Sequence, residues 1–209
     1  MAKTKKVMDL KNNIHEHPSS PRYTICISGA AETGHCAVDA PDKAKLLGRA
    51  IAQHGMILVT GATTGIPYWA AKGAKDAAGI VIGLSPASSE EDHVKNFQLP
   101  IDYHDLIIYT GFNYSGRNLF LTRAADATIV ICGRMGTLNE FSIAFEDNKP
   151  VGILEGTGGT ADMAREIIDK SHRGPGKVVF DSDPEKLLEK IIQLIEKEKS
   201  SGKTKTWTF

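Results

Sequence analysis

Three glycine-containing segments each follow an apolar run of the chain: residues 29–34 (GAAETG), 61–65 (GATTG) and 133–137 (GRMGT). Glycine lets backbone N–H groups approach an anion closely, and a helix that begins after such a turn directs its positive end toward the same place. One such turn is equally well explained as a tight connection between a strand and a helix, whereas three together favour a ligand that carries phosphate. The residues expected to bind it are Gly29, Ala30, Gly61, Ala62, Thr63, Thr64, Gly65, Gly133, Arg134, Met135, Gly136 and Thr137.

Two better-known phosphate motifs do not fit the sequence. Residues 29–34 have the glycine spacing of a P-loop, but His35 and Cys36 stand where lysine and serine or threonine are required. The Gly-Lys-Thr at 202–204 has Lys197 in place of the first glycine and follows a helical pattern instead of a strand. The G-x-G-x-x-G fingerprint is absent as well. These mismatches exclude a P-loop nucleoside triphosphatase and argue against an ordinary NAD dehydrogenase.

Two charged residues near the glycine segments are candidates for catalysis. Glu140 follows Thr137 by three positions, which is also the spacing of a capping box, in which both side chains accept N–H groups at a helix start. Arg117 stands near the start of the preceding helical pattern, where a solvated surface arginine is an equally ordinary explanation.

The elements that must position these residues alternate along the chain. The expected strands are residues 23–28, 56–60, 80–84, 106–109, 127–132, 151–154 and 177–180, and the expected helices are residues 42–54, 67–78, 115–125, 137–147, 160–171 and 184–198. Continuous apolar runs of this length are typical of parallel strands buried on both faces. The sequence therefore predicts an α/β fold, a Rossmann-like open parallel sheet with helices on both faces. The glycine segments should meet at one edge, because strand-to-helix turns lie at the carboxyl ends of the strands.

The chain has 209 residues, of which 41% are hydrophobic and 24% charged, with 25 basic and 25 acidic side chains. This composition predicts a single nucleotide-binding domain over residues 21–198, with a flexible N-terminal arm (1–20) and a C-terminal tail (199–209). A formal net charge of zero argues against a nucleic acid partner. No apolar stretch is long enough to span a membrane, and the basic start is not followed by an apolar signal core, so we expect a cytoplasmic protein.

The three cysteines are odd in number and lack metal-ligand spacing. Cys26 and Cys132 lie in apolar runs, where a small buried thiol is the ordinary explanation. We therefore expect reduced cysteines and no metal site.

The stretch from Arg117-Asn118 through residues 123–126 (RAAD) to 133–140 (GRMGTLNE) resembles the LOG family, the cytokinin-activating nucleoside 5'-monophosphate phosphoribohydrolases formerly labelled lysine decarboxylases. That family has an arginine-lysine pair, a strand, and then P-G-G-x-G-T-x-x-E, and the interval from Arg117 to Gly133 matches without a gap. Residues 61–74 and 79–86 are similar to its second glycine loop and its G-x-x-x-G-x-x-P strand. The resemblance covers about residues 23–154.

The sequence departs from the family pattern at four positions. Cys132 replaces the proline, Arg134 the second glycine and Asn118 the lysine, while Pro67 stands where the family continues Leu-Met-Gly. With these changes the chain looks more like the branch related to molybdenum-cofactor carrier proteins. The guanidinium of Arg134 would either clamp the phosphate in a bidentate manner or fill the space that two glycines leave open.

The resemblance implies two functions. In the first, the protein hydrolyses the N-glycosidic bond of a nucleoside 5'-monophosphate, with Arg117 and Glu140 as catalytic residues and Asn118 in the ligand site. In the second, it is a non-catalytic carrier or sensor of a nucleotide-like ligand such as molybdenum cofactor. Neither requires a cofactor beyond the bound nucleotide or molybdopterin-type ligand. The resemblance also implies a homodimer or larger homo-oligomer, and Trp207 and Phe209 are expected to contact the partner subunit.

Overall fold

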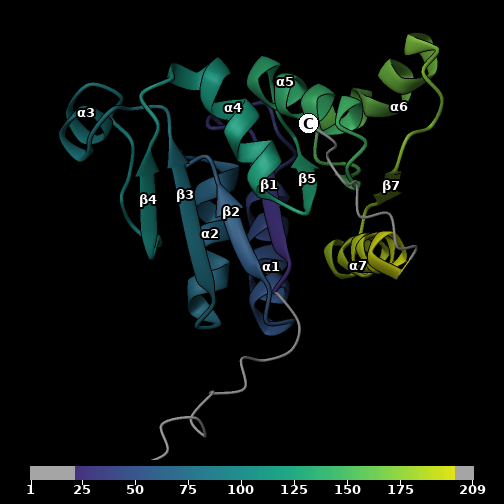
Figure 1. Ribbon diagram of the computed structural model, residues 1–209, viewed down its shortest axis with the longest axis horizontal. Helices are drawn as coiled ribbons and strands as arrows, with labels where there is room; N and C mark the ends of the chain where they lie inside the picture. Colours follow the sequence, from purple (N-terminus) through teal and green to yellow (C-terminus); the bar gives the residue numbers. More distant parts are fainter. Residues whose placement is uncertain (1–21, 201–209) are drawn as a thin grey trace, which may run out of the picture.

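A computed structural model describes residues 22–200 and contains one sheet of seven parallel strands (Figure 1). The strands are β1 (Thr24–Gly29), β2 (Ile57–Thr60), β3 (Ile80–Ser85), β4 (Leu106–Tyr109), β5 (Ala127–Ile131), β6 (Val151–Leu154) and β7 (Val178–Asp181). Their order in the sheet is β4-β3-β2-β1-β5-β6-β7, and every neighbouring pair is parallel. The predicted Rossmann-like α/β fold is confirmed.

Seven helices connect or follow the strands in the described part of the chain. They are α1 (Ala40–Gln53), α2 (Ile66–Asp76), α3 (Glu90–Lys95), α4 (Asn113–Ala124), α5 (Met135–Glu146), α6 (Gly159–Ser171) and α7 (Pro184–Ser200). The sequence did not reveal α3, because its six residues (EEDHVK) have no apolar repeat. Ser89 is the N-cap of this short helix, and its hydroxyl accepts the N–H of Asp92 at 3.1 Å. None of the described helices is long and apolar enough to cross a lipid bilayer.

The helices form two layers, one on each face of the sheet (Figure 1). Helices α1, α2 and α7 cover one face, where Leu47, Ile66 and Leu187 pack against Ile25 and Leu58. On the opposite face α4 packs against β1, β2 and β3, and α5 and α6 pack against β5 and β6. Burial on both faces was the wrong expectation for the edge strands: β4 alternates exposed and half-buried residues, and β7 is half-buried throughout.

The chain reverses its direction across the sheet at β1. From β1 it proceeds through β2 and β3 to β4, and it then returns to place β5 on the other side of β1. Gly29 pairs in register with Ile131, so β1 and β5 end at the same level. Ligands of open α/β sheets bind in the crevice that such a reversal leaves at the carboxyl ends of the strands. The fold thus places the candidate site between the segments that follow β1 and β5.

Candidate functional site

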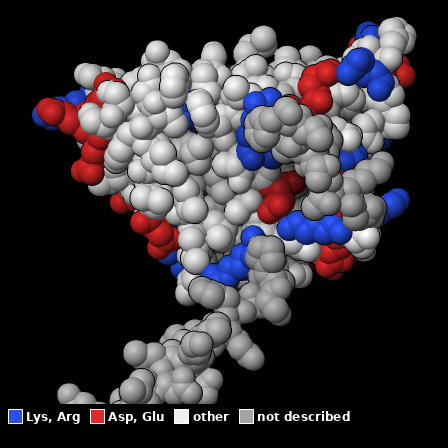
Figure 2. Space-filling model, viewed as in Figure 1, with Lys and Arg blue, Asp and Glu red and all other residues white. Residues whose placement is uncertain are grey.

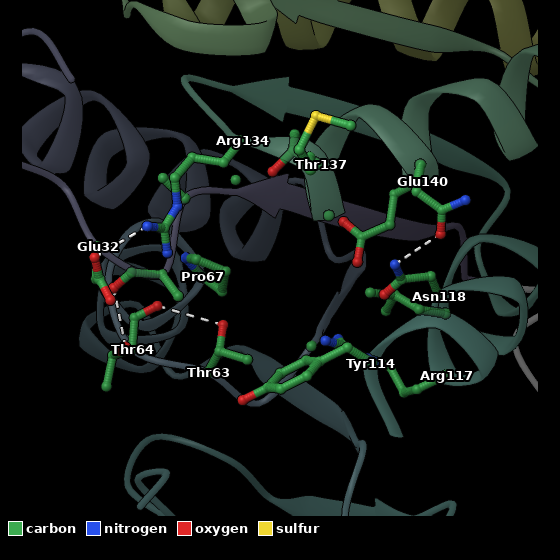
Figure 3. Close-up of a pocket in the computed structure, with 18 of the residues that line it drawn as sticks. Glu32, Thr63, Thr64, Pro67, Tyr114, Arg117, Asn118, Arg134, Thr137 and Glu140 are labelled. Atoms are coloured by element: carbon green, nitrogen blue, oxygen red, sulfur yellow. Dashed lines mark hydrogen bonds and ion pairs between the residues drawn. The ribbon is translucent and has the colours of Figure 1, made fainter. Parts of the chain in front are cut away.

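A pocket of about 630 Å³ lies at this crevice (Figure 3). Segments after β1, β2 and β5 and the start of α4 line it, so the three glycine segments meet at one edge of the sheet as predicted. The pocket is lined by Ile27, Gly29, Ala30, Ala31, Glu32, Gly61, Thr63, Thr64, Pro67, Phe97, Gln98, Leu99, Tyr114, Ser115, Arg117, Asn118, Leu121, Arg134, Met135, Gly136, Thr137, Asn139 and Glu140. Its volume is within the range of ordinary small-molecule sites.

Most of the predicted site residues line this pocket, but Ala62, Gly65 and Gly133 do not. Gly65 and Gly133 adopt positive φ angles of 71° and 109°, which favour glycine. A side chain at Gly65 would overlap the carbonyl oxygen of Ala30 at 2.2 Å, and one at Gly133 would overlap Thr137. These three residues form the turns without facing the pocket.

The glycines that do line the pocket have different roles. A Cβ atom at Gly29 would lie 2.5 Å from Ile66, so this glycine lets β1 and α2 approach each other. At Gly61 a Cβ atom would lie 1.8 Å from Nη1 of Arg117, so this glycine makes room for the guanidinium. At Gly136, in the first turn of α5, a Cβ atom would meet nothing within 4 Å. Of the three, Gly136 is the one that leaves backbone open to a ligand.

Arg117 is a buried cation that is short of hydrogen-bond partners. It projects from α4 into the pocket beside Tyr114, its exposed fraction is 4%, and its Nε and Nη1 atoms have no hydrogen-bond partner in the described structure. The explanation of Arg117 as a solvated surface arginine is therefore wrong. A buried guanidinium with free N–H groups is costly unless an anion accepts them. The start of α5 lies in the same pocket and adds the positive end of a helix dipole.

Glu140 is a buried carboxyl in the same pocket, with an exposed fraction of 7%. Its Oε2 accepts a hydrogen bond from the hydroxyl of Ser28 on β1. Burial raises the pKa of Glu140, and the charge of Arg117 and the Ser28 hydrogen bond oppose this rise only in part. The capping box is wrong, because α5 begins at Met135, has Arg134 as its N-cap and has no side-chain capping bond. The position of Glu140 is thus set by the sheet and not by the helix start.

Asn118 connects α4 to α5 next to this carboxyl. Its side-chain amide lies 2.9 Å from Oδ1 of Asn139. Turned by 180°, the same amide donates to Oε1 of Glu140 at 2.8 Å and to the carbonyl oxygen of Tyr114 at 2.9 Å. In that orientation both oxygens of Glu140 accept hydrogen bonds.

Arg134 lines the pocket but does not fill it, and the bidentate phosphate clamp considered for this side chain stays a prediction. Its Nη1 pairs with Oε2 of Glu32 at 3.0 Å, and both side chains are at least half exposed. Figure 3 shows this pair on one side of the pocket, opposite Asn118 and Glu140. The pair joins the segment after β1 to the segment after β5, so Arg134 bridges the two walls of the pocket.

Sequence reasoning missed the part of the wall formed by Phe97, Gln98, Leu99 and Tyr114. The first three follow α3, which the sequence did not reveal, and Tyr114 is in the first turn of α4. The rings of Phe97 and Tyr114 meet edge to face with centroids 5.7 Å apart. The only available signal was an aromatic residue just before the Ser115-Gly116-Arg117 segment.

The cysteines also differ from the expectation. Cys26 is buried and free as predicted, but Cys36 and Cys132 form a disulfide between the segments that follow β1 and β5. They are 96 residues apart in the sequence, and their Cα atoms lie 5.7 Å apart. Spacing along the chain carried no sign of this pair, because only the adjacency of β1 and β5 brings it together.

Comparison with known proteins places these observations in a family. The model of the SLOG cluster4 family matches residues 22–188. An uncharacterized protein of Archaeoglobus fulgidus is 30% identical over 127 residues, which is 61% of this chain and 78% of that protein. The molybdenum cofactor binding protein of Rippkaea orientalis is 28% identical, with a TM-score of 0.67 over 86% of this chain and 99% of that chain. The molybdenum cofactor carrier protein of Chlamydomonas reinhardtii is also 28% identical, with a TM-score of 0.67 over 84% and 99%. With its parallel sheet, its pocket at the chain reversal and this match over most of its length, the chain belongs to the SLOG cluster4 family, within the LOG-like superfamily.

Proposed function

We propose that the pocket binds a nucleotide-like small molecule through its phosphate, and that the protein carries or senses this ligand without converting it. The observation that carries the proposal is the buried guanidinium of Arg117, which lines the pocket and has no hydrogen-bond partner for Nε and Nη1 among the described residues. A phosphate accepts such N–H groups in charge-assisted hydrogen bonds, and the start of α5 supplies further donors on the same pocket wall.

The rest of the pocket suits the remainder of such a ligand. Phe97, Tyr114 and Pro67 present aromatic and apolar surface to a planar ring, and polar groups of Asn139 and Gln98 lie on the same walls. Both a nucleotide and a molybdopterin-type molecule combine a planar ring system with a phosphate. Two structural neighbours bind or carry molybdenum cofactor, which makes a molybdopterin-type ligand a first candidate.

Hydrolysis of a nucleoside 5'-monophosphate is the second candidate, because Arg117 and Glu140 face the same pocket. A carboxylate must be ionised to stabilise an oxocarbenium-like transition state. Burial raises the pKa of Glu140 and so favours its neutral form, and its oxygens are engaged by Ser28 and Asn118. These features favour binding over catalysis.

The test is to measure which small molecules the protein holds. The purified protein is denatured, the supernatant is examined by mass spectrometry, and binding of a nucleoside 5'-monophosphate and of its parent nucleoside is compared by calorimetry. We expect a phosphorylated molecule in the supernatant, or binding of the monophosphate that the nucleoside lacks. The proposal is contradicted if the supernatant contains no phosphorylated molecule and the protein either binds the monophosphate and the nucleoside equally or binds neither.

Substitution of Gly136 by valine should block the ligand without damaging the fold. The Cβ atom of the new side chain meets nothing within 4 Å in the protein, yet it projects from the pocket wall where an anion would approach α5. We expect Gly136→Val to abolish monophosphate binding in calorimetry and to leave the melting temperature close to that of the parent. Gly34→Val is the matched control, because Gly34 also has open space around it but does not line the pocket. Unchanged binding by Gly136→Val would place the ligand elsewhere.

We also propose that a second copy of the chain covers the apolar face formed by β4 and α4. On β4, Leu106 pairs in register with Ile82 of β3, and Ile108 pairs with Leu84 of β3. These β3 residues lie on the face of the sheet that α4 covers. Leu106 and Ile108, by contrast, are about half exposed. Phe112, Leu119 and Phe120 extend this exposed apolar surface along α4. In Figure 2 charged side chains lie mainly at the margins of this face. A contiguous apolar surface of this kind is typical of an interface. The predicted contacts of Trp207 and Phe209 lie outside the described residues.

Introducing a charge on this face should separate the subunits. We expect the parent to be a dimer or larger assembly by light scattering at micromolar concentration and Phe120→Asp to be a monomer, because an unpaired carboxylate would be buried in the interface. The control is Leu46→Asp, since Leu46 is similarly exposed but lies on α1, which covers the other face. A monomeric parent, or a Phe120→Asp variant of unchanged mass, would contradict the proposed interface.

A further inference from the structure

His35, Cys36 and Cys132 form a cluster beside the pocket. Their ligating atoms, one imidazole nitrogen and two sulfurs, all lie within 4.8 Å of one another. Three segments meet around them: residues 30–39 after β1, Cys132 and Gly133 after β5, and residues 155–158 after β6. The N–H of Cys132 donates to the hydroxyl of Thr157 at 2.8 Å, and the N–H of Ala37 donates to the carbonyl oxygen of Thr157 at 3.0 Å. The N–H of Cys36 donates to the carbonyl oxygen of Thr33 at 2.9 Å, so the N–H groups of both cysteines have partners that do not depend on the bond between the sulfurs.

The disulfide alone gives no reason for the position of the His35 side chain. Its Nε2 lies 3.5 Å from Sγ of Cys132 and 3.4 Å from the carbonyl oxygen of Gly133. A tetrahedral zinc ion holds sulfur at about 2.3 Å and nitrogen at about 2.0 Å, which separates the two ligand atoms by roughly 3.5 Å. The imidazole thus already stands at the distance from Cys132 that a shared metal ion requires.

We propose that, once the disulfide is reduced, Cys36, Cys132 and His35 bind a thiophilic divalent cation such as zinc. A dithiol supplies the two electrons: it is oxidised to its own disulfide, the Cys36–Cys132 bond breaks, and two thiols form. Binding of the cation then releases the two thiol protons, so that two thiolates and the neutral imidazole ligate the metal. This proposal is independent of the phosphate site proposed above.

Access and coordination number both agree with this assignment. His35 is exposed and Cys36 is partly exposed, so a reductant and a cation can reach the cluster from solvent, whereas Cys132 is buried beneath them. Three protein ligands leave a fourth position of the tetrahedron open, which is the arrangement of a reactive or exchangeable zinc site instead of a closed structural one. The sulfurs need only separate from bonding distance to ligand spacing, and a Cα–Cα distance of 5.7 Å allows this without movement of the strands.

The metal or the disulfide would join the same two segments. Cys132 directly precedes Gly133 and Arg134, and Cys36 follows the segment that carries Ala30 and Glu32. Either form therefore ties together the two walls of the pocket. The reduced, metal-free form leaves these walls joined near the cluster by the Arg134–Glu32 ion pair and by the contact of His35 with the carbonyl oxygen of Gly133.

The experiment uses the full chain with cobalt(II) as a spectroscopic probe for zinc. The protein is reduced with a phosphine, which water converts to the phosphine oxide as two thiols form, and the excess reductant is removed without oxygen. We expect the reduced protein to develop a thiolate-to-cobalt charge-transfer band at one equivalent of metal, and zinc to displace it. The oxidised protein should show no band. Absence of the band in the reduced protein overturns the proposal.

Variants separate this site from a simple disulfide and from Cys26. Cys36→Ser and Cys132→Ser should lose the band. His35→Ala should keep both cysteine ligands but bind cobalt at least about tenfold more weakly than the parent. Cys26→Ser is the matched control and should behave as the parent. If His35→Ala binds cobalt as tightly as the parent, the three-residue site is wrong.

As a second measurement on the unmutated chain, reduction should lower Tm by roughly 5 to 15 °C, and one equivalent of zinc should restore most of this loss. A reduced protein whose Tm does not respond to zinc also contradicts the site.

Discussion

Replacement of Arg117 by glutamine is expected to weaken binding of a nucleoside 5'-monophosphate by about a hundredfold. The variant removes a buried cation that lines the pocket and whose Nε and Nη1 have no partner in the described part of the chain, and each hydrogen bond to a charged group contributes roughly 1.5 kcal/mol or more. Binding of the parent nucleoside should change little, since it has no phosphate for Arg117 to hold. Calorimetry with the two molecules measures this difference directly.

The same variant should not lower the melting temperature. A guanidinium that is 4% exposed and whose Nε and Nη1 lack partners within residues 22–200 is a cost to the folded state, so removing its charge is expected to leave stability unchanged or higher. Arg123→Gln is the matched control on the same helix, because Arg123 pairs with Asp147 at the surface and its side chain is 60% exposed. An equal loss of affinity for monophosphate and nucleoside would show that Arg117 does not recognise the phosphate.

Replacement of Glu140 by glutamine separates a binding site from a catalytic one. If the carboxylate stabilises a transition state, its loss should cost about 2.7 to 4 kcal/mol, or a hundredfold to a thousandfold in the rate of base release. If the protein only binds its ligand, as we propose, the parent releases no base. The amide of the Glu140→Gln variant is neutral and so places no negative charge beside the bound phosphate. We therefore expect Glu140→Gln to bind the monophosphate at least as tightly as the parent. Base release by the parent that this variant loses would instead establish the hydrolase.

Glu140→Gln should also change how stability depends on pH. The folded protein raises the pKa of Glu140, chiefly through burial, so it holds this proton more tightly than the unfolded chain does. The stability of the parent therefore falls as the pH rises above about 4.3, the ordinary pKa of glutamate, and this loss continues up to the raised pKa of the folded state. Glutamine does not ionise and can still bond to Ser28, whose hydroxyl either donates or accepts.

Melting curves of the two proteins across this range measure the effect. We expect the variant to melt at a higher temperature than the parent at neutral pH and at a similar temperature near pH 4. The reverse order at neutral pH would mean that Glu140 is ionised and stabilised by Arg117 in the folded protein.

Local patterns in the sequence were sufficient to predict the strands, most helices and the edge of the sheet at which the site forms. Apolar runs and helical repeats report on neighbours a few residues apart, and these local patterns were enough to predict all seven strands and every helix except α3, which is too short and polar to show a repeat. Glycine after β1, β2 and β5 indicated the common edge, because parallel topology places all such turns at the carboxyl ends of the strands.

The contacts of the side chains at that edge, in contrast, depend on residues that are far apart in the sequence. Glu140 accepts from Ser28, 112 residues away, where local spacing had suggested a capping box. Gly61 accommodates the guanidinium of Arg117, a role that no turn motif encodes. Arg134 pairs with Glu32, and Cys36 pairs with Cys132, across about a hundred residues in each case. The Glu140–Ser28, Arg134–Glu32 and Cys36–Cys132 contacts all depend on β5 lying beside β1, whereas the Gly61–Arg117 contact does not. That adjacency follows from how the whole sheet buries its apolar faces and from no single segment of the sequence.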